Sequence, residues 1–407
     1  MRRVVVTGMG IASPLGCDVA EATARLRANE HGIVAMPAWD AIGHFSPRVA
    51  APVEVPKALE LSHKASRSMG RVAQLATIAT TIAVKDAGLG ADEFADGTIG
   101  LAYGSTNGSS KANEDWTRKL VAQNSFLGMT STTYLKFMSH TTAANLATHF
   151  GVHGRVLCTS AACVSATQAI GQGFESIAAG FSDVMVCGGA EELHFSHAAV
   201  FDMLHAASKA FNDTPGLTPR PFDQRRDGLV VGEGAGTLVL EEYERARRLG
   251  KRIYAEILGF GTNCDGTHVT NPSADGMRGS MARALRSAGC GPEAIDYVNA
   301  HATGTAIGDI AESQATYALF GDRVPVSSLK GHLGHTLGAC GAIELALSIG
   351  MLREGWIAPT RNLEVVGEHC APLDYVMGEL RRTPLSRILC NKFAFGGINT
   401  SLVVSAI

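Results

Sequence analysis

The sequence predicts an α/β protein built from two duplicated halves. A composition of 46% hydrophobic and only 18% charged residues, with 46 glycines, suits helices and strands that pack closely through small side chains. Apolar runs typical of buried strands alternate with segments of helical period, which favours a mostly parallel sheet covered by helices. A length of 407 residues exceeds the usual size of a single core, so we expect two halves, 1–248 and 249–407.

The first half opens with a strand. The segment RVVVTGMG (3–10) places three β-branched residues in a row before a glycine turn. A helix is expected around 19–29, and another over 72–89, where apolar residues recur at helical spacing and Gly88 ends the pattern. The segment GTIGLAYGSTNGSS (97–110) then predicts a strand that ends in a flexible Gly/Ser-rich loop.

Three further segments complete this half. The stretch RVLCTSAACVSATQAIGQGFESIAAG (155–180) predicts a strand, a turn of tiny residues and a helix. The segment SDVMVCGGAEEL (182–193) predicts another strand, and GEGAGTLVLEEYERARRLG (232–250) a strand that leads into a charged helix.

The second half repeats the first. The segment YAEILGFGTNCDG (254–266) is similar to the opening strand and glycine turn, and 324–350 has the strand, tiny-residue turn and long helix of 155–180. The segment ILCNKFAFGGINTSLVV (388–404) likewise matches 229–242. A period near half the chain is too long for a solenoid and indicates a duplicated α/β unit, and the absence of a Pro/Ser-rich linker predicts one rigid body.

Several classes of protein are excluded by composition. A net charge of −3 without a Lys/Arg block argues against nucleic-acid binding, and no run of apolar residues is long enough for membrane insertion. Nine cysteines without a C-x-x-C pair argue against a zinc site or a disulfide framework and indicate a reducing compartment. The N-terminal apolar run is too short for a signal peptide, so we expect a cytoplasmic protein.

The glycines of GMGIAS (8–13) suggest a dinucleotide site only superficially. Ser13 occupies the position of the third glycine in the nucleotide fingerprint, and no acidic residue closes a second strand about 20 residues later. We therefore discount a nicotinamide cofactor.

Cys163 is the strongest candidate for a nucleophile. A free cysteine is usually a small buried hydrophobic residue, but this one ends a run of tiny residues at the start of a predicted helix. Unpaired backbone N–H groups and the helix dipole at that position favour the thiolate. The pattern is that of a nucleophile elbow with sulfur in place of oxygen.

Two histidines of the second half are candidates for the acid–base residues that would assist Cys163. His301 ends a strand in YVNAHATGT, and His335 lies in the glycine-rich turn of SSLKGHLGHTLGACG. A lone histidine is more often structural. The repeat, however, makes the His335 turn the counterpart of the Cys163 turn. In a duplicated fold these two turns should face each other, which would bring both histidines towards the sulfur of Cys163. His332 in the same loop is a competitor.

Four motifs in register carry a family resemblance. The segments SAACVSATQAIG, HATGTAIGD, SSLKGHLGHTLGACG and NKFAFGGINTSLVV resemble the elongating β-ketoacyl-acyl carrier protein synthases, types I and II, of the thiolase superfamily. The resemblance covers essentially the whole chain. It implies a thiolase-like five-layered αβαβα fold, a homodimer, and decarboxylative Claisen condensation of an acyl-enzyme thioester with malonyl-acyl carrier protein in fatty-acid biosynthesis.

The resemblance also implies roles for single residues. Cys163 is expected to be the nucleophile, His301 and His335 the decarboxylation pair, and Lys330 a structural lysine paired with Glu344. The remaining roles are pantetheine binding by Thr303 and Thr305, gating by Phe393 and Phe395, and an oxyanion hole of the Cys163 and Phe395 N–H groups. Gly108 is expected either at the floor of the tunnel or as a flexible loop glycine. Neither a metal nor an organic cofactor is implied.

Departures from the family pattern surround the gate. Lys392 replaces a serine, Ala394 a glycine, Ile398 a threonine, and His332 an apolar residue. Because of these departures, the alternative function is that of a ketosynthase in a specialised polyketide or polyene pathway, with an identical or a non-identical partner subunit. A non-catalytic chain-length-factor-like subunit is disfavoured because Cys163 is present.

Two further points concern related enzymes and partners. A thiolase would use a second cysteine near the C-terminus, and Cys390 lacks the thiolase surroundings. The acyl carrier protein should dock on a basic patch, for which Lys64, Arg67 and Arg71 are candidates.

Overall fold

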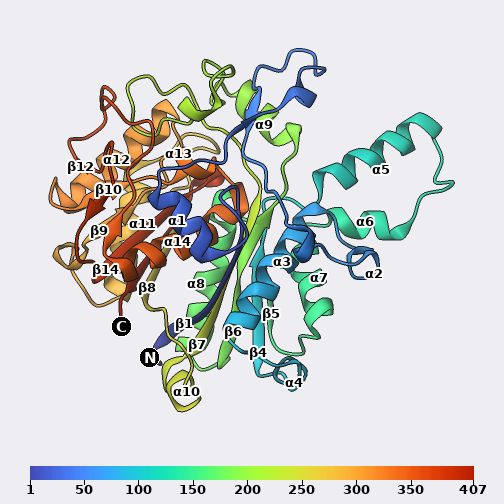
Figure 1. The fold of residues 1–407 in the computed structure, drawn as a ribbon, viewed down its shortest axis with the longest axis horizontal. Helices are drawn as coiled ribbons and strands as arrows, with labels where there is room; N and C mark the ends of the chain where they lie inside the picture. The colour runs from blue at the N-terminus through green and yellow to red at the C-terminus, as the bar shows by residue number, and fades with distance from the viewer.

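The computed structural model describes residues 1–407 and contains one large sheet with helices on its faces (Figure 1). The eleven strands follow the order β12 (Asp374–Tyr375), β10 (Pro325–Ser327), β9 (Tyr297–Asn299), β14 (Arg387–Phe393), β15 (Ile398–Ser405), β8 (Ala255–Cys264), β1 (Val4–Ala12), β7 (Gly234–Glu242), β6 (Val184–Glu191), β4 (Ile99–Gly104) and β5 (Val156–Thr159). Strands from the first half therefore occupy one side of the sheet and strands from the second half the other.

The two sides meet where β1 pairs with β8. Val4 lies opposite Ile257, and Val6 lies opposite Ala255, in an antiparallel ladder. Both strands are the first strands of their halves and repeat one another in sequence. The seam between the halves is thus made by two equivalent strands.

The helices form three layers around the two parts of the sheet. Helices α8 (Ser165–Ala178) and α14 (Cys340–Glu354) lie between the parts, as Figure 1 shows. Helices α3 (Arg71–Asp86) and α7 (Thr141–Phe150) cover the outer face of the first half, and α11 (Ala274–Ser287) and α12 (Ala306–Phe320) that of the second. These five layers confirm the predicted thiolase-like αβαβα fold.

Eight further helices complete the fold. They are α1 (Val19–Arg27), α2 (His63–Ser66), α4 (Ala91–Ala95), α5 (Ser110–Gln123), α6 (Ser131–Phe137), α9 (Phe195–Met203), α10 (Tyr243–Arg248) and α13 (Lys330–Leu333). The last of these, α13, is fully buried. The remaining strands form two short antiparallel pairs, β2 (Val34–Ala35) with β3 (Val49–Ala50) and β11 (Trp356–Ile357) with β13 (Arg381–Arg382). No helix combines the length and apolar character that crossing a membrane requires.

The sheet is mixed, so the prediction of a mostly parallel sheet was wrong. Strands β4, β5 and β6 are mutually parallel, as are β9, β10, β12 and β14. Strand β7 runs antiparallel to both β1 and β6, and β15 antiparallel to both β14 and β8. The reason for β15 is local: only the short segment 394–397 connects it to β14, which allows a hairpin but no helical crossover.

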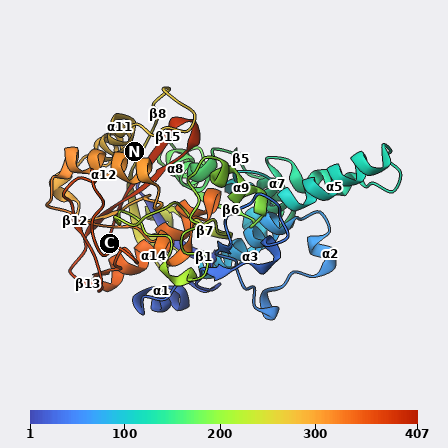
Figure 2. The same ribbon diagram turned by 90° about the horizontal axis from the view of Figure 1, so that it is seen from above.

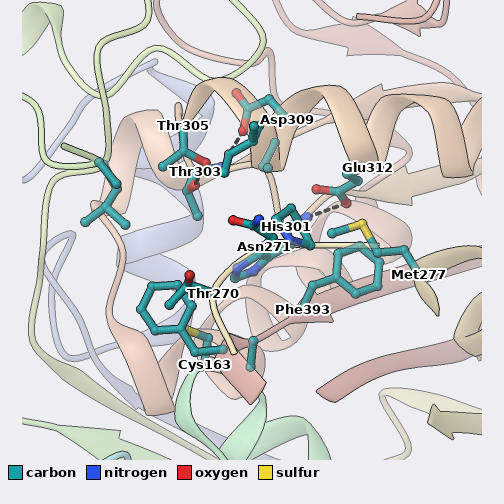
Figure 3. A pocket seen from close by; sticks show the side chains of 18 of the residues that line it. Cys163, Thr270, Asn271, Met277, His301, Thr303, Thr305, Asp309, Glu312 and Phe393 are labelled. Carbon is teal, nitrogen blue, oxygen red and sulfur yellow. Dashed lines mark hydrogen bonds between the residues drawn. The ribbon is translucent and has the colours of Figure 1, made fainter. Parts of the chain in front are cut away.

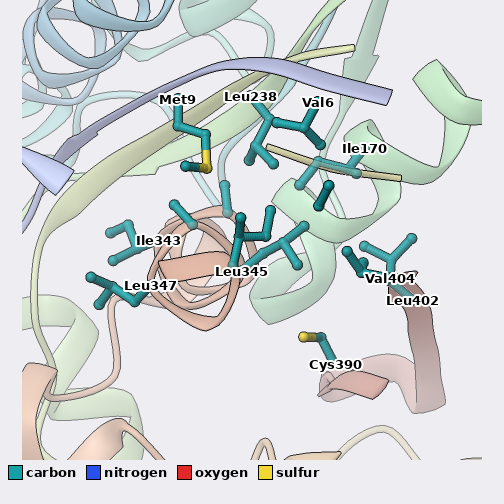
Figure 4. Packing of buried hydrophobic residues seen from close by; sticks show 14 of the residues in the cluster. Val6, Met9, Ile170, Leu238, Ile343, Leu345, Leu347, Cys390, Leu402 and Val404 are labelled. Carbon is teal, nitrogen blue, oxygen red and sulfur yellow. The ribbon is translucent and has the colours of Figure 1, made fainter. Parts of the chain in front are cut away.

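The main core lies around α14 (Figure 4). Ile343, Leu345 and Leu347 are fully buried and project from different sides of this helix. A helix that is apolar all round belongs inside a protein, since each of its faces must meet another element. The same cluster includes Met9 and Ile170 from the first half, so α14 packs both halves into one core.

The paired glycines of β1 and β8 allow helices to approach the strands closely. A Cβ at Gly10 would lie 2.1 Å from the Ala79 carbonyl oxygen of α3, and one at Gly261 would lie 2.2 Å from the Ser280 carbonyl oxygen of α11. The G-x-G pattern thus allows close packing of a helix on a strand in both halves. This agrees with the sequence, in which the pattern does not match a nucleotide-binding fingerprint.

We predict that Gly10→Ala lowers the free energy of unfolding by about 1–3 kcal/mol, because a methyl group has no room against the α3 backbone. Gly43→Ala, where an added Cβ meets nothing within 4 Å, is the matched control. Urea denaturation of both variants checks this, and equal stabilities would contradict the packing role.

Candidate active site

Cys163 lies in a strained turn between β5 and α8. The turn is a short 3-10 segment, Ala162–Val164, and Ala162 has a φ of 48°, which is rare for a residue with a side chain. The Ser165 hydroxyl holds the turn, since it donates to the Ala162 carbonyl at 2.7 Å and accepts from the Ala161 N–H at 3.0 Å. Such strain concentrates at functional sites.

The second half contains the equivalent turn. It is the 3-10 segment Leu337–Ala339 before α14, and Leu337 has a φ of 44°, close to that of Ala162. The two turns lie against each other, and the Cys340 thiol donates to the Cys163 carbonyl at 3.3 Å. The duplicated fold therefore brings both turns to one place.

The two histidines meet Cys163 at this point. His335 Nε2 lies 3.0 Å from Cys163 Sγ, and the rings of His301 and His335 are 5.1 Å apart and nearly perpendicular. The sulfur and one nitrogen of each ring lie within 4.8 Å of one another. His301 lies two residues after the end of β9, and its backbone N–H donates to Glu312 Oε1 at 2.7 Å (Figure 3). All three side chains are buried.

A cavity of about 220 Å³ opens onto this triad (Figure 3). Besides the triad, its walls include Thr303, Thr305, Phe393, Phe395, Phe201, Thr270, Asn271 and Met277. The hydroxyl groups of Thr303 and Thr305 are 3.1 Å apart. The cavity thus presents two adjacent hydroxyls and apolar walls in front of a sulfur atom.

Two backbone donors at the site have no partner. The N–H groups of Cys163 and Phe395 donate to no other protein group, whereas the neighbouring Gly396 N–H is held by the Val269 carbonyl at 2.7 Å. Free N–H groups beside a nucleophile can stabilise a developing oxyanion. Phe395 itself packs on Phe201, with ring centroids 5.5 Å apart.

Burial keeps both histidines neutral. The pKa values of His301 and His335 lie well below the usual value, first because burial disfavours the charged ring and then because the Lys330 ammonium is near. The Nδ1 atom of each ring has no hydrogen-bond partner. Two neutral imidazoles suit hydrogen-bond donation to an anion.

The thiol differs from the expectation for a helix N-terminus. Burial raises the pKa of Cys163 well above its usual value, and the nearby Cys340 thiol raises it further. The prediction of a resting thiolate was therefore wrong, because desolvation outweighs the helix dipole. The resting nucleophile is a thiol in contact with His335 Nε2.

A buried ionic layer supports the histidines. Lys330 Nζ lies 2.5 Å from Glu344 Oε1, as the sequence predicts for this pair. Lys392 Nζ lies 3.0 Å from the other oxygen of the same carboxylate. The sequence marks Lys392 as a departure from the family pattern, within an apolar strand and next to Phe393, but it does not predict the contact with Glu344.

His332 is structural and does not compete for the sulfur. Its Nδ1 lies 2.8 Å from the Glu30 carbonyl oxygen, and its Nε2 lies 3.1 Å from that of Pro359. Burial lowers its pKa to about 4, although the two carbonyls favour the protonated ring. The side chain ties two peripheral loops to α13.

Gly108 lies away from the cavity. A Cβ there would be 2.5 Å from the Phe137 carbonyl carbon of α6, so close packing accounts for this glycine. A role at the floor of an acyl tunnel stays a prediction.

The three donor atoms of the triad also have the spacing of a metal site. A thiolate and two imidazoles are ligands that Zn²⁺ prefers. Such binding would occupy the sulfur lone pair that the nucleophile requires and would take the place of the N–H proton on each ligating ring nitrogen, so it would oppose the use of these groups in catalysis.

We predict slow alkylation of Cys163 in the resting protein. At pH 7 the exposed Cys264 should react with iodoacetamide at least about 10-fold faster, because the buried Cys163 remains a thiol. Raising the pH should accelerate alkylation of Cys163. Peptide mapping after timed quenching measures both rates, and faster labelling of Cys163 at pH 7 would contradict the protonated resting state.

We predict that His332 makes stability depend on pH. Its pKa is near 6.5 when unfolded and about 4 when folded, so its contribution is present above pH 6.5 and is lost as the pH falls towards 4. At pH 5 this loss amounts to about 2 kcal/mol. Urea unfolding at pH 7.5 and pH 5 measures the change in unfolding free energy between the two pH values. This change should be smaller in His332→Leu than in the wild type, whereas His153→Leu, at an exposed position, should keep the wild-type change. A wild-type change in His332→Leu would contradict this prediction.

Comparison with known proteins identifies the family. The β-ketoacyl synthase N-terminal domain matches residues 1–246, and the β-ketoacyl synthase C-terminal domain matches residues 254–364. The 3-oxoacyl-[acyl-carrier-protein] synthase 1 of Haemophilus influenzae is 35% identical over 410 residues, which cover 99% of this chain and 98% of that protein.

Solved structures agree with this match. A β-ketoacyl synthase from Burkholderia phymatum STM815 has a TM-score of 0.96 and 48% identity, with both chains covered completely. The ishigamide ketosynthase/chain length factor has a TM-score of 0.92 and 32% identity, covering 100% of this chain and 99% of that one. The chain therefore belongs to the β-ketoacyl synthase family of acyl-transferring condensing enzymes, as its motifs predicted.

Proposed function

We propose that this protein condenses an acyl group on Cys163 with malonyl-acyl carrier protein, releasing carbon dioxide and 3-oxoacyl-acyl carrier protein. The observation that carries the assignment is the contact of His335 Nε2 with Cys163 Sγ in the wall of the cavity, with His301 beside it. A sulfur nucleophile supports the acyl transfer, and two neutral imidazoles support the decarboxylation.

In the first step, Cys163 Sγ attacks the thioester carbonyl of an acyl carrier protein. The thiol proton passes to His335 Nε2, the nearest base, and from there to the departing pantetheine sulfur. The N–H groups of Cys163 and Phe395 are free to hold the oxyanion. Removing one donor of such a pair typically costs about 3–4 kcal/mol of transition-state stabilisation.

In the second step, malonyl-acyl carrier protein enters the same cavity. The C–C bond to the carboxylate breaks, carbon dioxide leaves, and the electron pair forms an enolate whose oxygen accepts hydrogen bonds from His301 and His335. The enolate carbon attacks the acyl group on Cys163, and the sulfur leaves as a thiolate that takes up one proton from water to restore the resting thiol. Burial protects the acyl-enzyme from hydrolysis.

Residues along the cavity suit the remaining roles that the family implies. The paired hydroxyls of Thr303 and Thr305 are placed to bind the polar pantetheine arm. Phe393 and Phe395 flank Ala394 on the wall, where they can gate entry. Ala394 has an extended backbone with φ −131°, so alanine in place of glycine causes no strain.

The carrier protein is the proposed partner, because the curated relative is named for it. Lys64 and Arg67 remain candidates for docking its acidic surface. Arg71 is a poor candidate, since its guanidinium is already engaged by Glu233 at 2.9 Å and by the Val53 carbonyl at 2.8 Å. A reducing cytoplasm suits a nucleophile that must remain a thiol.

We also propose a dimer, in which the arm α5–α6 contacts the partner subunit. Figures 1 and 2 show this arm projecting from the body, and Val121, Phe126 and Leu127 at its end are exposed. Strand β5 is an unpaired sheet edge with Val156 exposed. Exposed apolar groups beside a free strand edge typically mark an interface.

A specialised pathway is the second candidate. The departures at Lys392, Ala394 and Ile398 flank the gate, and one similar structure is a ketosynthase/chain length factor. In that case the partner subunit would be non-identical.

Three variants separate the two steps. Cys163→Ala should abolish acylation but retain release of carbon dioxide from malonyl-acyl carrier protein, whereas His301→Ala should lose that release about 10²–10³-fold and retain acylation. His335→Ala should impair both, since His335 contacts the sulfur.

Radiolabelled carbon dioxide release and intact-mass analysis of acylation provide the two readouts. Loss of acylation in His301→Ala, or condensation by Cys163→Ala, would contradict the assigned roles.

A further inference from the structure

The ionic layer behind the histidines contains one more positive charge than its central carboxylate can balance. Glu344 on α14 lies between Lys330 of α13 and Lys392 of β14, and each ammonium faces a different carboxylate oxygen. All three side chains are at most 1% exposed, so water does not screen these charges.

Lys392 is held firmly in this position. Its ammonium donates to Asn299 Oδ1 at 2.9 Å and to the Asn391 carbonyl at 2.7 Å, besides its contact with Glu344. Asn299 ends β9, two residues before His301, and Lys392 directly precedes Phe393. The ammonium therefore lies behind the reacting groups and does not line the cavity.

We propose that Lys392 is a positioning residue whose ammonium gives this layer an excess positive charge, which adds to the effect of burial in keeping His301 and His335 as neutral hydrogen-bond donors in mildly acidic solution. The inference rests on the proposed function, because it concerns the decarboxylation step. Two ammonium groups face one ionised carboxylate, so the layer carries a charge of +1 and opposes a further proton on either imidazole.

The other titratable groups around the layer do not remove this excess. Glu312 of α12 accepts the His301 N–H, but burial raises its pKa to about 7, so it is largely neutral in mild acid. Cys340 of α14 and Cys390 of β14 have pKa values raised to about 11 by burial and are neutral thiols. The lowered pKa values of both histidines include contributions from Lys392.

The test is the pH profile of malonyl-acyl carrier protein decarboxylation by Lys392→Met, which removes the charge and keeps the length of the side chain. The pH at which the decarboxylation rate falls on the acid side should be about one pH unit higher than in the wild type, with rates at pH 8 less affected. Lys392→Arg, which restores the charge, should return this pH towards the wild-type value.

Lys251→Met is the matched control. Lys251 likewise donates to two oxygen atoms, the backbone carbonyls of Ala87 and Gly88 at the end of α3, but it faces neither histidine. This variant should keep the wild-type profile.

The ring ¹H–¹³C signals of the histidines provide a readout independent of turnover. In Lys392→Met, two buried histidines should titrate at higher pH than in wild type. Superimposable profiles and titrations for Lys392→Met and wild type would overturn the proposal for Lys392. Absence of decarboxylation in the wild type itself would instead overturn the proposed function, whereas the shift of the ring signals would still report on the charge.

Discussion

The contact between Cys163 Sγ and His335 Nε2 is the interaction on which the rest of the molecule depends. Its two partners are 172 residues apart and come from different halves of the chain. They meet because β1 pairs with β8, because α8 and α14 share one core, and because equivalent strained turns begin both helices. The duplicated fold can thus be understood as a device that brings a nucleophile and a base face to face.

Burial of this contact sets the chemistry. Desolvation raises the pKa of the thiol and lowers those of both imidazoles, so the resting site contains a neutral nucleophile and two neutral histidines. The charged groups lie behind the histidines, where the Glu344 carboxylate pairs with the ammonium groups of Lys330 and Lys392. A site of this kind avoids the cost of a resting charge in an apolar cavity and stabilises anions only as they form.

The repeat was the most informative feature of the sequence. It correctly placed the Cys163 turn opposite the His335 turn, because glycine spacing and apolar periodicity are local properties. Strand direction was predicted less well: the antiparallel placement of β7 and β15 depends on connections and partners that periodicity does not reveal.

Long-range geometry accounts for the other differences. The thiol pKa was misjudged because the depth of burial depends on both halves together. His332 and His335 look alike in one loop, yet only the tertiary structure directs one ring to carbonyl groups and the other to sulfur. The position of Lys392 on Glu344 could likewise not be read from a strand pattern, since a lysine in a strand ordinarily faces water.

The most direct test of the account is intact mass spectrometry of the protein after mixing with a panel of acyl carrier protein thioesters, followed by peptide mapping. The account predicts one acyl group per chain, located on the peptide that contains Cys163. The acyl chain that loads best would distinguish fatty-acid elongation from a specialised pathway. Acylation of another cysteine, such as Cys340 or Cys264, in place of Cys163 would contradict the central claim.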